Sequence, residues 1–401
     1  MSGRSAASHE PQRLLFRRHR PAPGKRTIAV MAPSYGLERV TYVIPSDAHD
    51  YVRLSRIPLH RFERRGTFLD QTPIVVGPRV DLVHTFNHIV VNRPFVVSAE
   101  MELPRFLFDP PAWQRRAGMR LLANDRCRGI WPLSDAARNY ITRRFEAEGF
   151  GRLAGKTEVF RGAVTPLPAG AERAGYAESG PLRLLFVGGD GLRKGLEPTL
   201  EAARRFRDGG MEVLLTVVGM PTEEGYAVPG VRFPADRART LLAEDWVTHH
   251  ATLPNADVRR LMGEHDLFVF PTIDESLGWV VAEAAMSGTP TISTDIFALP
   301  ELVRDGETGW TIDLPLDADR RWAWIGRPDA RDAWIDAQAH ITTKLTEILA
   351  RIAVDRRLVA ERGVRAKSYI SGLYGVDVAA AHLERLYDQA INRRAPSAAG
   401  R

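Results

Sequence analysis

A regular alternation of short apolar segments with amphipathic segments in the second half of the chain constrains the fold more than any other feature. Apolar runs at 182–188, 212–219, 266–271 and 290–294 are separated by segments of helical spacing, most clearly at 196–206, 256–264 and 278–287. Strands that alternate with helices in this way form a parallel sheet with helices packed on its faces. The sequence therefore predicts a Rossmann-like α/β domain in this half.

The first half of the chain repeats the pattern less clearly. Short apolar runs at 27–33, 72–77, 81–86 and 94–99 predict strands, and a helix is expected from Asp135 to Ala147 with Ser134 as its N-cap. Segments at 335–368 and 376–391 also have the spacing of helices. A Pro-, Gly- and Ala-rich stretch at 164–181 suits a connection between domains. A length of 401 residues fits two or three domains.

The positive charge of the chain lies at its two ends. The net charge is +6, the first 26 residues hold seven Lys or Arg and one acid, and the last ten hold three Arg and no acid. The body between them is therefore slightly acidic, which argues against a nucleic-acid binder. The basic N-terminal arm is either a solvated tail or a peripheral contact with an anionic membrane surface.

Cysteine content and hydropathy bear on the compartment. Cys127 is the sole cysteine, so no intrachain disulfide forms, and no run reaches the length of a membrane-spanning helix. The N-terminus is polar and Arg-rich and lacks the apolar stretch of a secretory signal. We expect a cytoplasmic protein that is either free or peripheral to the inner face of a membrane.

The first motif with chemical content is FVGGDGLRKG, residues 186–195, where an apolar run ends in glycines and a basic pair precedes a helical segment. Gly188 and Gly189 let a ligand approach the backbone closely, and Arg193 and Lys194 can neutralise phosphate oxygens. The motif matches neither the dinucleotide fingerprint nor the Walker spacing. On its own it is equally well explained as a strand-to-helix turn.

The second motif, PTIDESLGWVVAEAAMSGTP at 271–290, is more specific. A strand stops at Pro271, a loop carries Glu275 and Ser276, and a helix begins near Gly278. The free backbone N–H groups near Leu277 and Gly278, together with the positive end of the helix dipole, form an anion site. Glu283, on the following helix, would be repelled by a phosphate and suits a neutral ribose diol. Each acid alone is more simply a solvated residue, but together they predict a nucleoside diphosphate site.

These motifs resemble the signature of the group 1, retaining glycosyltransferases of the GT-B fold. The spacing from Glu275 to Glu283, the following GTP at 288–290 and LPELVRDGETGW at 299–310 carry the resemblance, and the loop with Lys194 resembles the diphosphate-binding loop of that family. The resemblance spans residues 182–310. It implies two Rossmann-like α/β domains that face each other across a cleft, with donor and acceptor bound between them.

The resemblance also implies roles for individual residues. Glu283 hydrogen-bonds the ribose of a nucleotide sugar, Glu275 faces the donor sugar, and Lys194 stabilises the leaving diphosphate. Contacts to the phosphates come from the backbone of Leu277 and Gly278, next to Ser276. The donor-binding set is thus Gly188, Gly189, Arg193, Lys194, Ser276, Leu277, Gly278 and Glu283.

The chain departs from the family pattern at several positions. Many members have an arginine where Gly189 stands, so one cation is missing, and Arg193 is the candidate to compensate. The loop after the first strand reads APSYGLERVTYV rather than the usual Gly-Gly loop. Glu100 stands where many members have a histidine. It is either a catalytic residue that hydrogen-bonds a sugar or acceptor hydroxyl, or an N-cap or salt-bridge residue.

Two further groups of residues have simpler structural explanations. His84 and His88 lie four residues apart in a strand-to-loop context, where core or capping roles are expected rather than a metal site. Trp310, Trp322, Trp324 and Trp334 gather half of the eight tryptophans in one segment. We expect them to anchor that segment to the core, although aromatic faces also stack on sugars.

The predicted domains follow from these assignments. They are a flexible basic arm at 1–26, a Rossmann-like acceptor domain at 27–170, a Rossmann-like donor domain at 181–370, a C-terminal helix at 371–391 that we expect to pack back on the acceptor domain, and a tail at 392–401.

The resulting functional hypothesis is a glycosyltransferase that moves a sugar from a UDP- or GDP-sugar to a hydroxyl of a glycan, lipid or small-molecule acceptor, with retention of configuration. No cofactor is expected: Lys194, Arg193 and the helix terminus at Gly278 would balance the leaving-group charge without a metal. The alternative is a nucleotide-sugar-binding protein of the same fold that has lost turnover.

Overall fold

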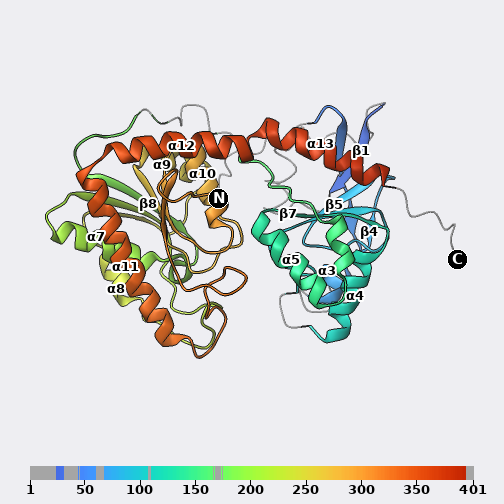
Figure 1. The fold of residues 1–401 in the computed structure, drawn as a ribbon, viewed down its shortest axis with the longest axis horizontal. Coiled ribbons are helices and arrows are strands. Elements are labelled where there is room, and N and C mark those ends of the chain that lie inside the picture. The colour runs from blue at the N-terminus through green and yellow to red at the C-terminus, as the bar shows by residue number, and fades with distance from the viewer. Residues whose placement is uncertain are drawn as a thin grey trace, which may run out of the picture. The chain divides into compact units, whose positions relative to one another are not determined.

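The structure of the protein is a computed structural model. It describes residues 24–30, 44, 46–59, 67–106, 110–165, 167, 173 and 175–393. It comprises two compact units, Met1–Thr165 with Tyr374–Arg401, and Pro166–Leu373 (Figure 1). Most of the basic arm and of the C-terminal tail, nearly all of the APSYGLERVTYV loop and much of the 164–181 connection lie outside the described residues. None of the helices in the described part of the chain is long and apolar enough to cross a membrane.

The first unit is built on a parallel sheet in the order β2-β1-β5-β6-β7. Three of its strands follow the predicted apolar runs, and nearly every residue in those strands is buried, as in a sheet covered on both faces. The run at 72–77 contributes only a two-residue strand, β4, which pairs antiparallel with β3. The strands are β1 (Arg26–Val30), β2 (His49–Arg53), β3 (Ser55–Arg56), β4 (Val75–Val76), β5 (Leu82–Phe86), β6 (Phe95–Ala99) and β7 (Cys127–Pro132).

Helix α5 of the first unit (Asp135–Ala147) has the predicted bounds, and the hydroxyl of its N-cap Ser134 accepts a hydrogen bond from Ala137 N at 3.0 Å. Such a cap satisfies one of the four unpaired N–H groups at a helix start. The other helices that the structure describes in this unit are α3 (Phe68–Gln71), α4 (Ala112–Ala123), the 3-10 helix at Gly151–Lys156 and α13 (Val376–Asn392).

Helix α13, at the C-terminal end of the described chain, packs on strands β5 and β7 of the first unit. His84 on β5 is fully buried, with Nδ1 2.7 Å from the Tyr387 hydroxyl and Nε2 2.8 Å from the Ser98 hydroxyl. Burial lowers the pKa of His84 to about 3, so the imidazole is neutral. As expected from the sequence, His84 is a core residue, and it ties the last helix to the first sheet.

The second unit has a larger parallel sheet in the order β10-β9-β8-β11-β12-β13. Numbered along this unit, the order is 3-2-1-4-5-6, the arrangement of a doubly wound Rossmann sheet. Four of these strands follow predicted apolar runs, whereas β10 and β13 were not predicted from the sequence. The strands are β8 (Leu182–Gly188), β9 (Val213–Gly219), β10 (Val247–His250), β11 (Leu267–Phe270), β12 (Thr291–Thr294) and β13 (Gly309–Ile312).

The connections between parallel strands place the helices of the second unit on both faces of its sheet. Helices α7 and α8 follow β8 and β9 toward one edge, whereas α9 and α10 follow β10 and β11 toward the other and cover the opposite face (Figure 1). Helix α11 packs along α7. The helices are α6 (Gly191–Lys194), α7 (Leu196–Asp208), α8 (Asp236–Leu242), α9 (Asn255–Glu264), α10 (Trp279–Met286), α11 (Arg331–Val354) and α12 (Arg357–Tyr374), with a 3-10 turn at Leu299–Glu301.

The segment 335–368, which the sequence analysis treated as one helical region, is divided between α11 and α12. The break falls at Asp355, whose carboxylate accepts a hydrogen bond from Arg357 N at 3.2 Å and pairs with the Arg357 guanidinium. An Asp side chain that satisfies a backbone N–H two residues ahead competes with the helical hydrogen bond. A new helix therefore starts after it.

The tryptophan-rich segment mostly anchors itself to the core, as expected. The exposed fractions of Trp310, Trp322 and Trp334 are 3%, 0% and 2%. The Trp322 ring lies 5.8 Å from the rings of both Trp324 and Trp334. Trp324 is only half-buried and so differs from the other three.

Candidate functional site

The candidate site lies where the strand order of the second sheet reverses, between β8 and β11. These two strands are hydrogen-bonded neighbours, and the chain leaves β8 toward one edge and β11 toward the other. In open α/β sheets the crevice at such a switch point, outside the carboxyl ends of the strands, is where ligands bind. The loop after β8 carries Arg193 and Lys194, and the loop after β11 carries Glu275.

Glycines shape the loop after β8 so that Lys194 faces the loop after β11. A Cβ on Gly188 would lie 2.8 Å from Lys194 Cβ, closer than side chains tolerate. Gly195 has φ +80° and packs against the backbone of Pro271, so glycine is required there on both counts. The short helix α6 is capped by Asp190, which accepts a hydrogen bond from Arg193 N. Gly189 is exposed.

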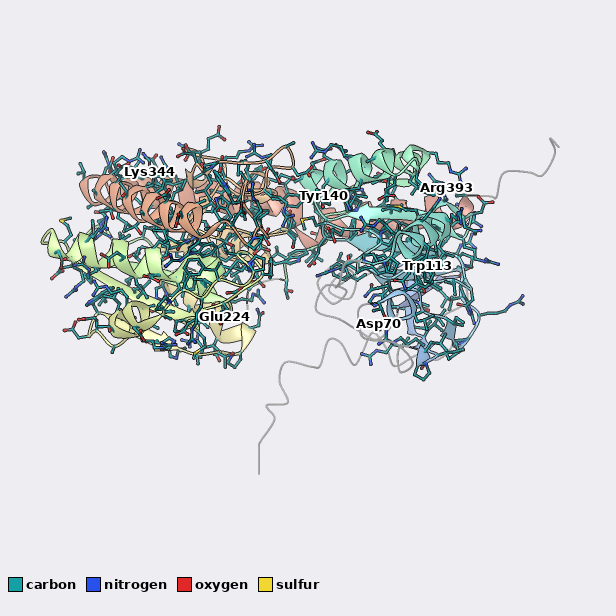
Figure 2. The ribbon with its side chains drawn as sticks, turned by 90° about the horizontal axis from the view of Figure 1, so that it is seen from below. Asp70, Trp113, Tyr140, Glu224, Lys344 and Arg393 are labelled. Atoms are coloured by element: carbon teal, nitrogen blue, oxygen red, sulfur yellow. The ribbon has the colours of Figure 1, made fainter. Side chains whose placement is uncertain are left out.

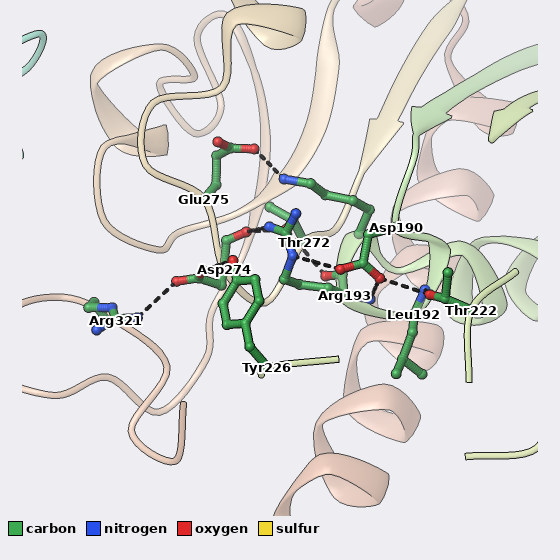
Figure 3. Close-up of polar contacts among 10 residues, drawn as sticks. Asp190, Leu192, Arg193, Thr222, Tyr226, Thr272, Asp274, Glu275 and Arg321 are labelled. Atoms are coloured by element: carbon green, nitrogen blue, oxygen red, sulfur yellow. Dashed lines mark hydrogen bonds and ion pairs between the residues drawn. The ribbon is translucent and has the colours of Figure 1, made fainter. Parts of the chain in front are cut away.

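Lys194 and Glu275 form an ion pair across the two loops (Figure 3). Their side chains are 11% and 17% exposed, so both charges are largely removed from water. Burial lowers the pKa of the Lys194 ammonium, although the negative charge of Glu275 acts to raise it. Burial alone would raise the pKa of Glu275, but the charge and hydrogen bond of Lys194 outweigh it and hold the pKa below its usual value.

The carboxylate of Glu275 also binds the backbone amides of its own loop. Its Oε1 accepts hydrogen bonds from Ser276 N at 3.0 Å and from Leu277 N at 3.5 Å. The groups that the sequence analysis assigned to phosphate therefore hold a carboxylate in this structure. The site can bind an anion, and here the anion is the side chain of Glu275.

Helix α10 begins directly after this loop. Gly278, its N-cap, has φ +91°, and a Cβ there would lie 2.8 Å from Leu299 Cδ2. This left-handed residue turns the chain so that the first N–H groups of the helix, which have no acceptor within it, point out of its N-terminus. Glu283 lies farther along the same helix and is buried, with 3% of its surface exposed.

Arg193 is held by protein groups rather than presented to solvent. Its Nε donates to Asp190 Oδ2 at 3.0 Å and its Nη1 to the Asp274 carbonyl at 2.5 Å (Figure 3). The guanidinium also lies over the Tyr226 ring, 5.3 Å from its centre. Arg193 therefore fixes the two loops relative to each other, a role that the sequence analysis did not consider.

The residues that hold Arg193 form a network that sequence reasoning missed. Asp274 accepts hydrogen bonds from the Tyr226 hydroxyl at 2.6 Å and from Arg321 Nη2 at 3.3 Å, and Thr222 Oγ1 donates to Asp190 at 2.8 Å (Figure 3). Asp190 and Asp274 stand inside the two motifs, but their partners come from distant loops. The one sequence signal for Asp190 and Asp274 is that both follow the ends of predicted strands.

Glu100 belongs to the first unit, whereas the residues described above belong to the second. It follows β6, its Oε2 lies 3.1 Å from Arg105 Nη1, and its backbone N–H donates to Asn87 Oδ1 at 3.4 Å. Glu100 therefore forms a salt bridge, which is one of the structural roles considered for it from the sequence. Within the part of the chain that the structure describes, no group of three or more His, Cys, Asp or Glu side chains is arranged to hold a metal ion.

Comparison with known proteins finds a family match for part of the second unit. Residues 171–321 match the model of "Glycosyl transferases group 1". A glycogen synthase of Mycobacterium tuberculosis is 32% identical over 131 residues, which are 33% of this chain and 30% of that protein. The chain spans about a third of the length of the curated relatives that it matches first.

Solved structures are similar over nearly the whole chain. A glycosyltransferase from Rickettsia africae has a TM-score of 0.60 at 14% identity and covers 92% of this chain and 100% of its own. Anabaena Alr3699/HepE, solved with UDP and glucose, has a TM-score of 0.59 at 15% identity and covers 90% and 99%. Residues 171–321 of the second unit thus match the group 1 glycosyltransferase model, and the chain has the GT-B fold of these solved structures.

Proposed function

We propose that this protein transfers a sugar from a nucleoside diphosphate donor to an acceptor hydroxyl. The observation that carries the proposal is the ion pair of Lys194 with Glu275 beside the N-terminus of α10, at the switch point of a Rossmann sheet. A buried cation, the N-terminus of a helix and a nearby buried acid are the groups that a nucleotide sugar requires.

In this proposal the diphosphate lies on the N-terminus of α10, near the backbone of Ser276, Leu277 and Gly278. The glycines at 188 and 189 let its oxygens approach the end of β8. Glu283, buried farther along α10, accepts hydrogen bonds from the ribose hydroxyls. The similarity to Alr3699/HepE, which was solved with UDP, favours UDP as the nucleotide for the first tests, with GDP as the alternative.

Glu275 changes partners when the donor binds. The carboxylate is held by Lys194 and by the amides of Ser276 and Leu277, which are the groups that the diphosphate needs. Two anions cannot share these donors without repulsion, so the carboxylate turns toward the neutral hydroxyls of the donor sugar. Lys194 is then released to the leaving phosphate.

The chemical step follows from this arrangement. As the bond between sugar and diphosphate breaks, negative charge grows on the terminal phosphate while the sugar becomes oxocarbenium-like. Once Glu275 has turned to the sugar, Lys194 and the α10 terminus face this growing charge and stabilise it with no further rearrangement in the chemical step. They supply positive charge without a metal. The acceptor attacks the face that the diphosphate leaves, which retains the anomeric configuration, and the departing phosphate takes the acceptor proton.

The acceptor is a glycan, lipid or small molecule with a free hydroxyl, bound by the first unit. The glycogen synthase relative makes a glycan acceptor the first to test. Glu100 follows a strand at the carboxyl edge of the first sheet and is the candidate contact to that hydroxyl, with Arg105 as its partner.

The test is to incubate the protein with UDP-, GDP- and ADP-sugars and to measure release of the nucleoside diphosphate, with and without oligosaccharide acceptors. We expect one base to be preferred, and NMR of the product to show the anomeric configuration of the donor. Binding of a nucleotide sugar without release of the diphosphate or transfer of the sugar would instead favour the non-catalytic alternative. Gly189, which stands where many family members have an arginine, supports that alternative.

A further inference from the structure

The segment between β13 and α11, residues 313–330, folds into a compact unit of turns beside a pocket. Leu316 bridges to Trp322, Ala323 N donates to the Pro315 carbonyl at 2.9 Å, and Gly326 N donates to the Ala227 carbonyl at 2.8 Å. These bonds fix the backbone on both sides of Trp322 and Trp324, although the segment contains no helix or strand.

The pocket that this segment forms with α11 has a volume of about 520 Å³. It is lined by Trp322, Trp324, Asp313, Asp336 and His340, among others, and by none of the residues assigned to the donor. This volume falls within the roughly 300–1,000 Å³ of pockets that bind small ligands. All of its lining residues belong to the second unit.

The aromatic part of the lining offers one accessible indole. Trp322 is fully buried and supports Trp324, whose ring is inclined at 50° to it, whereas Trp324 itself remains half-buried. A single supported aromatic face suits a flat apolar surface such as the C–H face of a pyranose ring. A quaternary ammonium group would need aromatic faces on several sides.

The polar part of the lining consists of two carboxylates, Asp313 and Asp336, and the imidazole of His340. Asp313 is 82% exposed, and Asp336 is also exposed. His340 Nε2 lies 3.0 Å from the Asp313 carbonyl, which fixes the ring at the pocket wall. The lining includes no Lys or Arg. Carboxylates without cations favour neutral hydroxyl groups and repel phosphate, sulfate and nucleotides.

We infer that this pocket is a second carbohydrate site, which binds a neutral saccharide by stacking on Trp324 and by hydrogen bonds to Asp313 and Asp336. The inference does not depend on the proposed reaction, because the donor residues do not line the pocket. Arg321, next to Trp322, bonds to Asp274 beside Glu275, so the saccharide-binding segment is tied to the donor loop.

The inference is tested by calorimetric titration of the full chain with maltoheptaose, cellohexaose and chitohexaose. We expect at least one to bind with a Kd in the millimolar range, and Trp324→Ala to weaken that binding at least about tenfold. Asp336→Ala, a change at an exposed residue that leaves the fold intact, should weaken it several-fold. The matched control is Trp113→Ala, in α4 of the first unit, where the tryptophan is 63% exposed (Figure 2).

Titration of the same variants with UDP separates this inference from the proposed function. Unchanged UDP affinity in Trp324→Ala, with oligosaccharide binding lost, supports a separate saccharide site. The inference is overturned if none of the three oligosaccharides binds at 20 mM, if Trp324→Ala binds as tightly as the wild type, or if tetramethylammonium binds there instead.

Discussion

Glu275 occupies the hydrogen-bond donors that the donor diphosphate needs. Its carboxylate contacts Lys194 and the amides of Ser276 and Leu277, and its pKa is held below the usual value by the charge of Lys194, which outweighs the effect of burial. The residue therefore has two opposite effects in the proposed cycle. It competes with a free nucleoside diphosphate, and it contacts the sugar of a complete donor.

The variant Glu275→Gln should separate these two effects. Without the competing charge, UDP should bind as tightly as to the wild type or up to about tenfold more tightly. Turnover of the UDP-sugar should fall at least about tenfold, because a charge-assisted contact to the sugar is lost. Calorimetry and a UDP-release assay measure the two quantities, and weaker UDP binding by the variant would contradict this role.

The variant Glu283→Gln should act on binding alone. A charge-assisted hydrogen bond is worth about 1.5–3 kcal/mol, so UDP affinity should fall roughly ten- to hundredfold. The comparison variant is Glu347→Gln, an exposed acid on α11 that pairs with Lys344. Equal UDP affinity in Glu283→Gln and the wild type would refute the assignment of the ribose to this residue.

At the level of elements, the docking of α13 on the first sheet depends on a neutral histidine. The folded pKa of His84 is about 3, below the ordinary histidine value of about 6.5, because the ring is fully buried. Between these two values the unfolded chain binds a proton that the folded protein does not, so stability falls as the pH is lowered. The loss is at most about 1.4 kcal/mol per pH unit below 6.5.

We therefore expect amides of β5 and β6 to lose protection against hydrogen exchange from pH 7 to pH 5, with a correction for intrinsic exchange rates. His84→Asn should be less stable but should show a shallower pH dependence. Burial also lowers the pKa of His49 and His88, so part of the dependence should remain. His250→Asn, on β10 of the second unit, is the control, and an equally steep slope in His84→Asn would contradict the prediction.

Elements with a local signal could be predicted from the sequence, and those defined by distant contacts could not. Helix α5 was predicted with its bounds because Ser134 is a local cap. Three of the four residues of strand β10 are polar and the strand lies at the sheet edge, so its VTHH sequence lacks the apolar run of a buried strand. The same limit applies to the site, where Lys194 and Glu275 stand in motifs but Tyr226 and Arg321 reach Asp274 from distant loops.

At the level of the whole molecule, the positive charge at the proposed site is supplied by protein groups that the second sheet positions. Lys194, the α10 terminus and the supporting Arg193 are positioned by two adjacent strand ends. We therefore expect EDTA to leave the rate of UDP release from a UDP-sugar unchanged, and added Mg²⁺ or Mn²⁺ not to raise it. Loss of activity in EDTA that returns with one of these ions would show that the site needs a metal.

The most direct test of the central claim is the rate of UDP-sugar turnover in Lys194→Ala, with Lys344→Ala on α11 as the control (Figure 2). Lys194 meets charge that grows in the transition state, so kcat should fall about 10²–10³-fold while KM changes less than about tenfold. Lys344→Ala should match the wild type. A Lys194→Ala protein that turns over donor at the wild-type rate would contradict the account.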